Sequence, residues 1–255
     1  MIRAAASAKS EHEPTASEVQ TALRAAVDPE KATFLPRFFK AGPGEYAEGD
    51  KFLGVTVPRQ RHIVQQFQTI PLAEITRLLM SEWHEDRLTG LLLLVERYKK
   101  GDEAVQKACY DLYMAHTACI DNWDLVDSSA AYIVGPWLDG RPEKMTVLRQ
   151  LAQSKSLWER RIAMLATFDY IKKGRADEGI EIAELLLHDT HDLIQKAVGW
   201  MLRETGKRVD RPLLLAFLNE HAATMPRTTL RYAIEHLDLA VRKDYLSRRS
   251  STGVQ

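Results

Sequence analysis

Residues 156–174 read SLWERRIAMLATFDYIKKG, and this stretch decides the fold class. Its apolar positions recur three and four residues apart, the spacing of one face of an α-helix. These positions include Ile162, Leu165, Ala166 and Phe168. Ser156 suits a helix N-cap and has Glu159 at capping-box spacing, while two lysines before Gly174 suit a helix C-terminus. The stretch therefore predicts helical structure with one buried face.

Three tryptophans mark successive copies of this helical unit. Trp83, Trp123 and Trp158 are 40 and 35 residues apart, and each follows a residue suited to cap a helix. The expected caps are Ser81, Asp121 and Ser156. Later helices of the series are expected to begin at Asp192 and near Thr228. A period of 35 to 40 residues with two helices per unit is typical of an α-solenoid of HEAT-like repeats.

The predicted fold class is therefore all-α. Alternating strand patterns and hairpin dipeptides are scarce, which disfavours a sheet. We expect a curved single domain over residues 18–246, whose concave groove is lined by the second helix of each pair. Residues 1–17 and 247–255 are expected to be disordered tails.

One polar residue per unit falls in equivalent register. Asp127, Arg161, Lys196 and Arg231 follow one another at intervals of 34, 35 and 35 residues. Equivalent positions of stacked repeats line up along one surface. Because these residues are polar, we expect them on the concave wall and not in the core.

Composition is that of a globular protein with formal net charge +0. Zero net charge gives no support to nucleic-acid binding, although the basic residues are somewhat more frequent in the C-terminal half. No apolar run is long enough for a membrane span, and no secretion signal is present. Cys109 and Cys119 lack metal-ligand spacing. We expect a cytoplasmic protein with reduced cysteines.

Two stretches combine polar and aromatic residues in a way that suits a site. In residues 121–128, Trp123 and Asp127 are four apart and share a helix face, although Trp123 packed between helices and a solvated Asp127 would give the same pattern. In residues 156–161, one or both of Arg160 and Arg161 are suited to bind phosphate or to form a surface ion pair with Glu159 or with a neighbouring repeat.

A third stretch, residues 195–204, reads QKAVGWMLRE. Its Gly199 lies inside an expected helix, where glycine costs roughly 1 kcal/mol relative to alanine. Such a glycine indicates a close approach to the backbone, made either by a ligand or by a crossing helix.

These stretches, in this order, resemble the AlkD-type family of DNA alkylation repair enzymes. The resemblance runs from about Val19 to about Leu237. The strings that carry it are DPEKA at 28–32, FLGV at 52–55 with Pro58, WDLVDS at 123–128, WERR at 158–161, QKAVGWMLRE at 195–204 and RYAIEH at 231–236. The chain departs from the family pattern at Asp192 and Leu193, where aromatics are usual, so DNA contacts there are expected to differ.

The resemblance implies roles for several residues. Asp127 matches the catalytic carboxylate, and Trp123 and Trp200 match tryptophans that contact the damaged nucleotide. Arg161 matches an arginine that contacts phosphate near the lesion. Further DNA contacts are expected from Arg203, Lys196 and Phe38.

The implied activity is that of a monofunctional DNA glycosylase in base excision repair. Its expected substrates are positively charged alkylated purines in duplex DNA, N3-methyladenine, N7-methylguanine and bulkier cationic adducts, with an abasic site as product. A cationic purine leaves as a neutral base, so one carboxylate that stabilises the sugar cation suffices. We expect no metal, no cofactor, no obligatory protein partner and a monomer. Two alternatives stay open: a non-catalytic HEAT-repeat protein that binds branched or bent DNA, and a protein-interaction solenoid.

Overall fold

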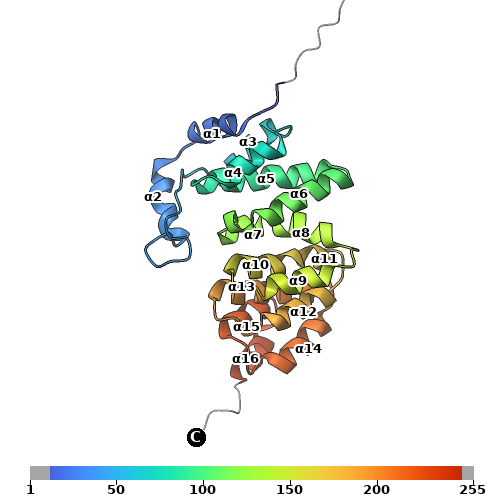
Figure 1. The fold of residues 1–255 in the computed structure, drawn as a ribbon. Helices are drawn as coiled ribbons and strands as arrows, with labels where there is room; N and C mark the ends of the chain where they lie inside the picture. The colour runs from blue at the N-terminus through green and yellow to red at the C-terminus, as the bar shows by residue number, and fades with distance from the viewer. Residues whose placement is uncertain (1–11, 249–255) are drawn as a thin grey trace, which may run out of the picture. The chain divides into compact units, whose positions relative to one another are not determined.

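The computed structural model of this protein describes residues 12–248 and confirms the all-α prediction (Figure 1). Within these residues, β pairing is limited to one isolated parallel bridge between Lys51 and Trp83. None of the described helices combines the length and the apolar character that crossing a membrane requires. The expected tails lie mostly outside the described residues, but α1 begins at Ala16, slightly earlier than predicted.

The helices form two compact units, which meet in the sequence between Leu94 and Val95. The single domain expected over residues 18–246 stays a prediction. The N-terminal unit contains α1 (Ala16–Arg24), α2 (Pro29–Phe38), α3 (Val57–Gln66), α4 (Leu72–Leu79) and most of α5 (His84–Lys100).

A loop of the N-terminal unit is fixed by a buried carboxylate. Glu85 accepts hydrogen bonds from the backbone N–H groups of Leu53, Gly54 and Val55. Gly54 has a φ of +84°, and a Cβ there would lie 2.2 Å from the carbonyl oxygen of Asp28. Glycine is therefore required where this loop meets the start of α2. The FLGV string thus has a structural role.

A second buried network joins a loop to α5. The Asp50 carboxylate bonds His84 Nδ1 at 2.8 Å and Arg87 Nη2 at 2.9 Å, and all three side chains are at least nine-tenths buried. Burial raises the pKa of Asp50, but the His84 hydrogen bond and the charges of Arg87 and His84 outweigh it, so that the pKa is lowered. The ionised carboxylate therefore stabilises this unit.

The C-terminal unit stacks helices in pairs. Figure 1 shows α7, α10, α13 and α15 following one another, with α9, α12 and α14 beside them, and the inter-helix contacts agree. Its helices are the last turn of α5, α6 (Glu103–Ala115), the 3₁₀ turn η1 (Thr117–Cys119), α7 (Trp123–Asp127), α8 (Ala130–Leu138), α9 (Lys144–Ala152), α10 (Leu157–Ala166), α11 (Phe168–Lys172), α12 (Asp177–Leu185), α13 (Asp192–Arg208), α14 (Arg211–His221), α15 (Arg227–Ala233) and α16 (Leu239–Ser247). This is the solenoid-like arrangement predicted.

Buried hydroxyls interrupt the second helices at regular intervals. Ser129 Oγ donates to the Leu125 carbonyl at the break between α7 and α8, and Thr167 Oγ1 donates to the Met164 carbonyl between α10 and α11. Side chains that bond back to a carbonyl of the preceding turn bend helices. Asp127 therefore stands at the end of a short helix, directly before such a break.

The helix starts agree with the sequence, with two small corrections. Trp158 lies in the first turn of α10, and Ser156 caps that helix by accepting from the Glu159 N–H. Trp123 begins α7, but the N-cap is Asn122 and not Asp121. Trp83 lies just before α5, because that helix begins at His84. The last two helices of the series begin at Asp192, as predicted, and at Arg227, beside the expected Thr228.

Gly199 is explained by helix packing. A Cβ at this position would lie 2.5 Å from both the Thr229 carbonyl oxygen and the Tyr232 Cβ, which belong to α15. The close approach left open by the sequence is therefore a helix crossing. Gly135 of α8 repeats the arrangement, since its Cβ would lie 2.4 Å from the Ala166 carbonyl oxygen.

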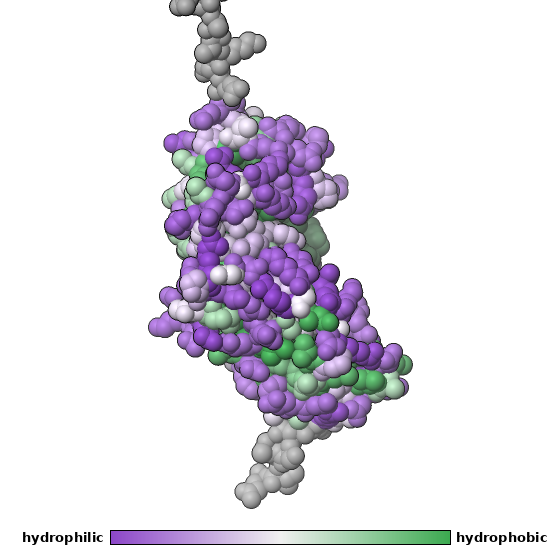
Figure 2. Space-filling view, turned by 90° about the vertical axis from the view of Figure 1, so that its right-hand side faces the viewer, coloured by the Kyte–Doolittle hydropathy of each residue, from purple (hydrophilic) through white to green (hydrophobic). Residues whose placement is uncertain are grey.

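The face of the molecule drawn in Figure 2 is largely hydrophilic, with apolar residues gathered towards the C-terminal end of the chain. Three leucines of the C-terminal unit are exposed, namely Leu185 at the end of α12, Leu213 in α14 and Leu239 at the start of α16.

Candidate functional site

Asp127 is the last residue of α7, a five-residue helix that begins directly after its cap Asn122. The Asn122 side chain accepts from the Trp123 N–H at 2.8 Å and is itself fully buried. The Asp127 side chain is 18% exposed. The carboxylate is therefore sheltered but reachable from solvent.

Arg161 holds this carboxylate. Its Nε donates to Asp127 Oδ1 and its Nη2 donates to Asp127 Oδ2, both at 2.8 Å. Its Nη1 donates to the Leu193 carbonyl at 2.5 Å. One buried guanidinium thus joins α7, α10 and the first turn of α13. Asp127 and Arg161, which the interval of 34 predicted to share one wall, are in direct contact at this point.

The electrostatics of Asp127 reflect two opposing effects. Burial raises the pKa of Asp127 above its ordinary value, and the nearby Asp124 adds to that rise. The charge and the hydrogen bonds of Arg161 act in the opposite direction. The carboxyl group therefore holds a proton more readily than an exposed aspartate, and Arg161 limits this effect.

Arg161, which the resemblance matches to a phosphate contact, is buried in this structure. The residue is 5% exposed, and three of its nitrogen atoms bond to Asp127 and Leu193. A guanidinium engaged in this way orients the carboxylate. The expected contact of Arg161 with a DNA phosphate stays a prediction. The ion pair with a neighbouring repeat that the sequence left open is observed, but it is buried and not at the surface.

The two tryptophans occupy adjoining parts of this unit. Trp123 is half-buried and stands one turn before Asp127 on α7. Trp200, also half-buried, lies in the middle of α13, where its ring contacts Phe168 with centroids 5.9 Å apart. Their expected contacts with the damaged nucleotide stay predictions.

The other predicted DNA contacts are engaged within the protein. Lys196 forms an ion pair with Asp192 at 2.7 Å, and Arg203 pairs with Glu235. Phe38 belongs to the N-terminal unit, where it ends α2, is 50% exposed and stacks with Phe34. A DNA contact by any of these three side chains stays a prediction.

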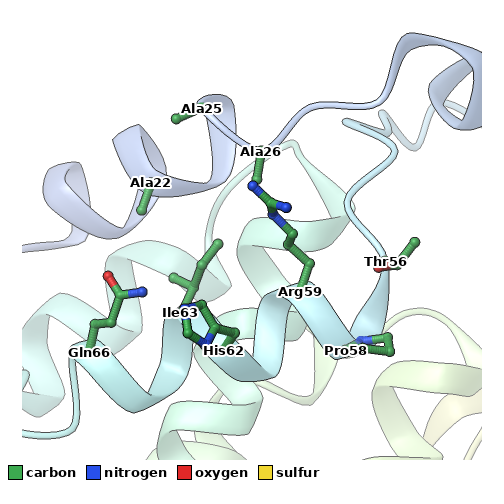
Figure 3. Close-up of a pocket in the computed structure, with 9 residues that line it drawn as sticks. All are labelled: Ala22, Ala25, Ala26, Thr56, Pro58, Arg59, His62, Ile63 and Gln66. Atoms are coloured by element: carbon green, nitrogen blue, oxygen red, sulfur yellow. The ribbon is translucent and has the colours of Figure 1, made fainter.

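The N-terminal unit has a cleft of its own, of about 670 Å³, between α1 and α3 (Figure 3). Figure 3 shows Arg59 of α3 extending towards Ala26 at the end of α1. His62 lies one turn further along α3 and lines the same cleft. None of the predicted site residues lines it. Within residues 12–248 no group of three or more acidic, histidine or cysteine side chains is placed to hold a metal ion.

A sequence model described as "DNA alkylation repair enzyme" matches residues 19–237. The chain belongs to the DNA alkylation repair enzyme family. This confirms the resemblance that the WDLVDS and QKAVGWMLRE strings indicated, over nearly the span expected from them.

A solved structure supports the fold of this family member. A predicted DNA alkylation repair enzyme from Enterococcus faecalis superimposes with a TM-score of 0.66 at 19% identity, covering 84% of this chain and 97% of that one. At this identity the likeness concerns the fold alone. The comparison with curated protein sequences gave no match.

Proposed function

We propose that this member of the DNA alkylation repair enzyme family is a DNA glycosylase that hydrolyses the N-glycosidic bond of positively charged alkylated purines in duplex DNA. The observation that carries the proposal is the sheltered carboxylate of Asp127, oriented through both oxygens by Arg161 and one helical turn from Trp123. The family supplies the reaction class, namely repair of alkylated DNA.

The chemistry needs little beyond such a carboxylate. When the bond between sugar C1′ and the purine nitrogen breaks, its electron pair neutralises the cationic base, which departs without protonation. The sugar then carries the positive charge. A carboxylate in a partly dehydrated site stabilises that charge far better than one in water. Water adds to C1′ and gives up a proton, which leaves an abasic site and the free base.

Pairing with Arg161 leaves Asp127 able to act on that water. Each carboxylate oxygen accepts one hydrogen bond from Arg161, whereas a carboxylate offers about four acceptor positions. The raised pKa of Asp127 makes the carboxylate a better proton acceptor than an ordinary aspartate. Arg161 would therefore position the carboxylate and keep it ionised between turnovers.

The tryptophans would select for charge. An indole face attracts a cation by about 0.5–2 kcal/mol, depending on how far both are dehydrated. Trp123 and Trp200 would thus favour a cationic lesion, or the sugar cation that forms from it, over a neutral nucleotide. The proposed mechanism does not require a cavity that encloses the base. Specificity would then also come from the damaged base itself, because its glycosidic bond breaks more easily than that of a normal nucleotide.

The test is the release of base from a methylated duplex by the wild-type protein. We expect free 7-methylguanine or 3-methyladenine together with an alkali-labile abasic strand, and no release of uracil from a matched uracil-containing duplex, because uracil is neutral. Binding of the methylated duplex without any base release would reject the glycosylase proposal and leave a non-catalytic DNA-binding protein.

A further inference from the structure

A row of alternating cations and aromatic rings adjoins the candidate site within the C-terminal unit. Tyr132 of α8 has two lysine ammonium groups near its ring, Lys99 at 5.6 Å and Lys172 at 4.7 Å from the centroid. Phe168 likewise lies near two cations, Lys172 at 5.2 Å and Arg208 at 5.4 Å. The order is thus Lys99, Tyr132, Lys172, Phe168, Arg208. We call these five residues the cation–ring row.

The row follows from the repeat itself. The string ERYKKG ends α5 and DYIKKG ends α11, so Lys99 and Lys172 occupy equivalent places in the two strings. Arg208 is the last residue of α13. The final turns of these second helices therefore supply one cation each. The row also reaches the candidate site, because Phe168 contacts Trp200.

The charge in the middle of the row is not neutralised by a partner. Lys99 pairs with Glu96 and Arg208 pairs with Glu204. Lys172 makes no hydrogen bond or ion pair within residues 12–248, whereas the adjacent Lys173 forms ion pairs with both Asp139 and Asp169.

The environment of Lys172 disfavours its own charge. Partial burial of the ammonium lowers the pKa of Lys172 first, and the charges of Lys173, Arg208 and Lys99 lower it further. Only Asp169 acts in the opposite direction. Cations held close together repel one another, and a bound anion would relieve this repulsion. The arrangement therefore suits an anionic ligand.

We propose that Lys99, Lys172 and Arg208 bind phosphates of one DNA strand beside the candidate site, with Tyr132 and Phe168 holding the cations in place. This inference deepens the proposed function and rests on DNA being the ligand. Lys172 lies within about 10 Å of Lys99 and about 11 Å of Arg208, from their distances to the shared rings. A few phosphates of one strand span such intervals, since a strand carries one charge per about 3.4 Å of helix axis.

A structural role would explain the same lysines in another way. Cations in the last turn of a helix interact favourably with its dipole and its unpaired carbonyls. That role predicts a loss of stability when Lys172 is replaced, with DNA affinity unchanged. Binding and stability must therefore be measured on the same variants.

The experiment compares Lys172→Gln with Lys107→Gln, which removes the same charge from an exposed position of α6. The dissociation constant of an undamaged duplex is measured between about 50 and about 200 mM salt, because each phosphate contact adds about 0.9 to the salt slope. We expect Lys172→Gln to lower the salt slope by about 0.9. Between about 50 and about 200 mM salt, the variant should therefore lose about 3-fold less affinity than the wild type loses. Lys107→Gln should leave the slope at the wild-type value.

The inference would be overturned if Lys172→Gln had the same salt slope as Lys107→Gln, with or without a lower melting temperature. It would also be overturned if the wild-type protein bound no duplex at low salt. The rings are tested by Tyr132→Ala, which should weaken binding while Tyr132→Phe retains it. Base release from methylated DNA separates the two proposals. Release by the wild type with an unchanged Lys172→Gln slope rejects only the row, and a lowered slope without any base release rejects only the glycosylase.

Discussion

Arg161 donates to both carboxylate oxygens of Asp127 at 2.8 Å, although the two residues are 34 positions apart in the sequence. One repeat interval thus separates a carboxylate from the guanidinium that orients it. The third bond of Arg161, to the Leu193 carbonyl, ties the pair to the following repeat. The position of Asp127 is therefore set by three successive helices of the stack.

The first prediction concerns the pH dependence of base release. The proposed reaction uses ionised Asp127, whose pKa is raised by burial and held down by Arg161. Activity should therefore fall as the pH decreases through this raised pKa, at a higher pH than an exposed aspartate would give. Arg161→Gln removes the opposing charge and should move the acid limb of kcat/KM to still higher pH.

The measurement is a pH profile of 7-methylguanine release by the wild type, Arg161→Gln and the control Arg149→Gln. Arg149 is a half-exposed arginine of α9 that pairs with Glu181. An acid limb at the same pH in all three proteins would contradict the assigned role of Arg161.

The second prediction concerns Gly199. In most helices, replacing glycine by alanine stabilises by about 1 kcal/mol. Here the added Cβ would meet backbone of α15 at 2.5 Å, so Gly199→Ala should instead destabilise by about 1–3 kcal/mol, the usual effect of overpacking. Because Trp200 is the next residue, base release should fall as well.

Urea unfolding of Gly199→Ala and of Gly179→Ala checks this prediction. A Cβ at Gly179 of α12 would lie 3.3 Å from its nearest neighbour, the Ile171 side chain. Gly179→Ala should therefore have a free energy of unfolding close to that of the wild type. Equal stability of the two variants would contradict the proposed crossing.

The third prediction concerns the N-terminal unit. Asp50→Asn removes the charge that His84 and Arg87 share, and breaking such a buried pair costs about 3–5 kcal/mol. The folded-state pKa of Asp50 is lowered, so its contribution is complete above the unfolded pKa of about 3.9 and is lost as the pH falls through the folded value.

The free energies of unfolding of wild type and Asp50→Asn should therefore differ strongly at about pH 7 and converge as the pH falls below the ordinary aspartate pKa of about 3.9. Denaturant titrations across this range measure the difference directly. A deficit of the same size at both ends would show that the ionised carboxylate is not what stabilises this network.

Repeat spacing in the sequence was enough to predict much of the fold and part of the site. The intervals between Asp127, Arg161 and Lys196 predicted one shared wall, and the structure places Asp127 and Arg161 in contact. Spacing could not decide whether Arg161 faces a phosphate or a carboxylate, because both ligands match a guanidinium.

The cation–ring row was missed for a similar reason. Lys172 stands before Gly174, and lysines before a glycine are ordinary at a helix C-terminus. The equivalence of ERYKKG and DYIKKG was visible in the sequence. The repeat did not reveal Tyr132, because this residue lies in α8, which contains no copy of the repeated string.

The central claim is that the Asp127 carboxylate performs the chemistry, and single-turnover release of 7-methylguanine by Asp127→Asn tests it most directly. We predict a loss of about 10²- to 10⁴-fold, the usual contribution of a positioned acid–base group, with duplex binding retained. Asp111→Asn, which changes an exposed carboxylate of α6, should release base at the wild-type rate. Release by a folded Asp127→Asn protein at the wild-type rate would contradict the account.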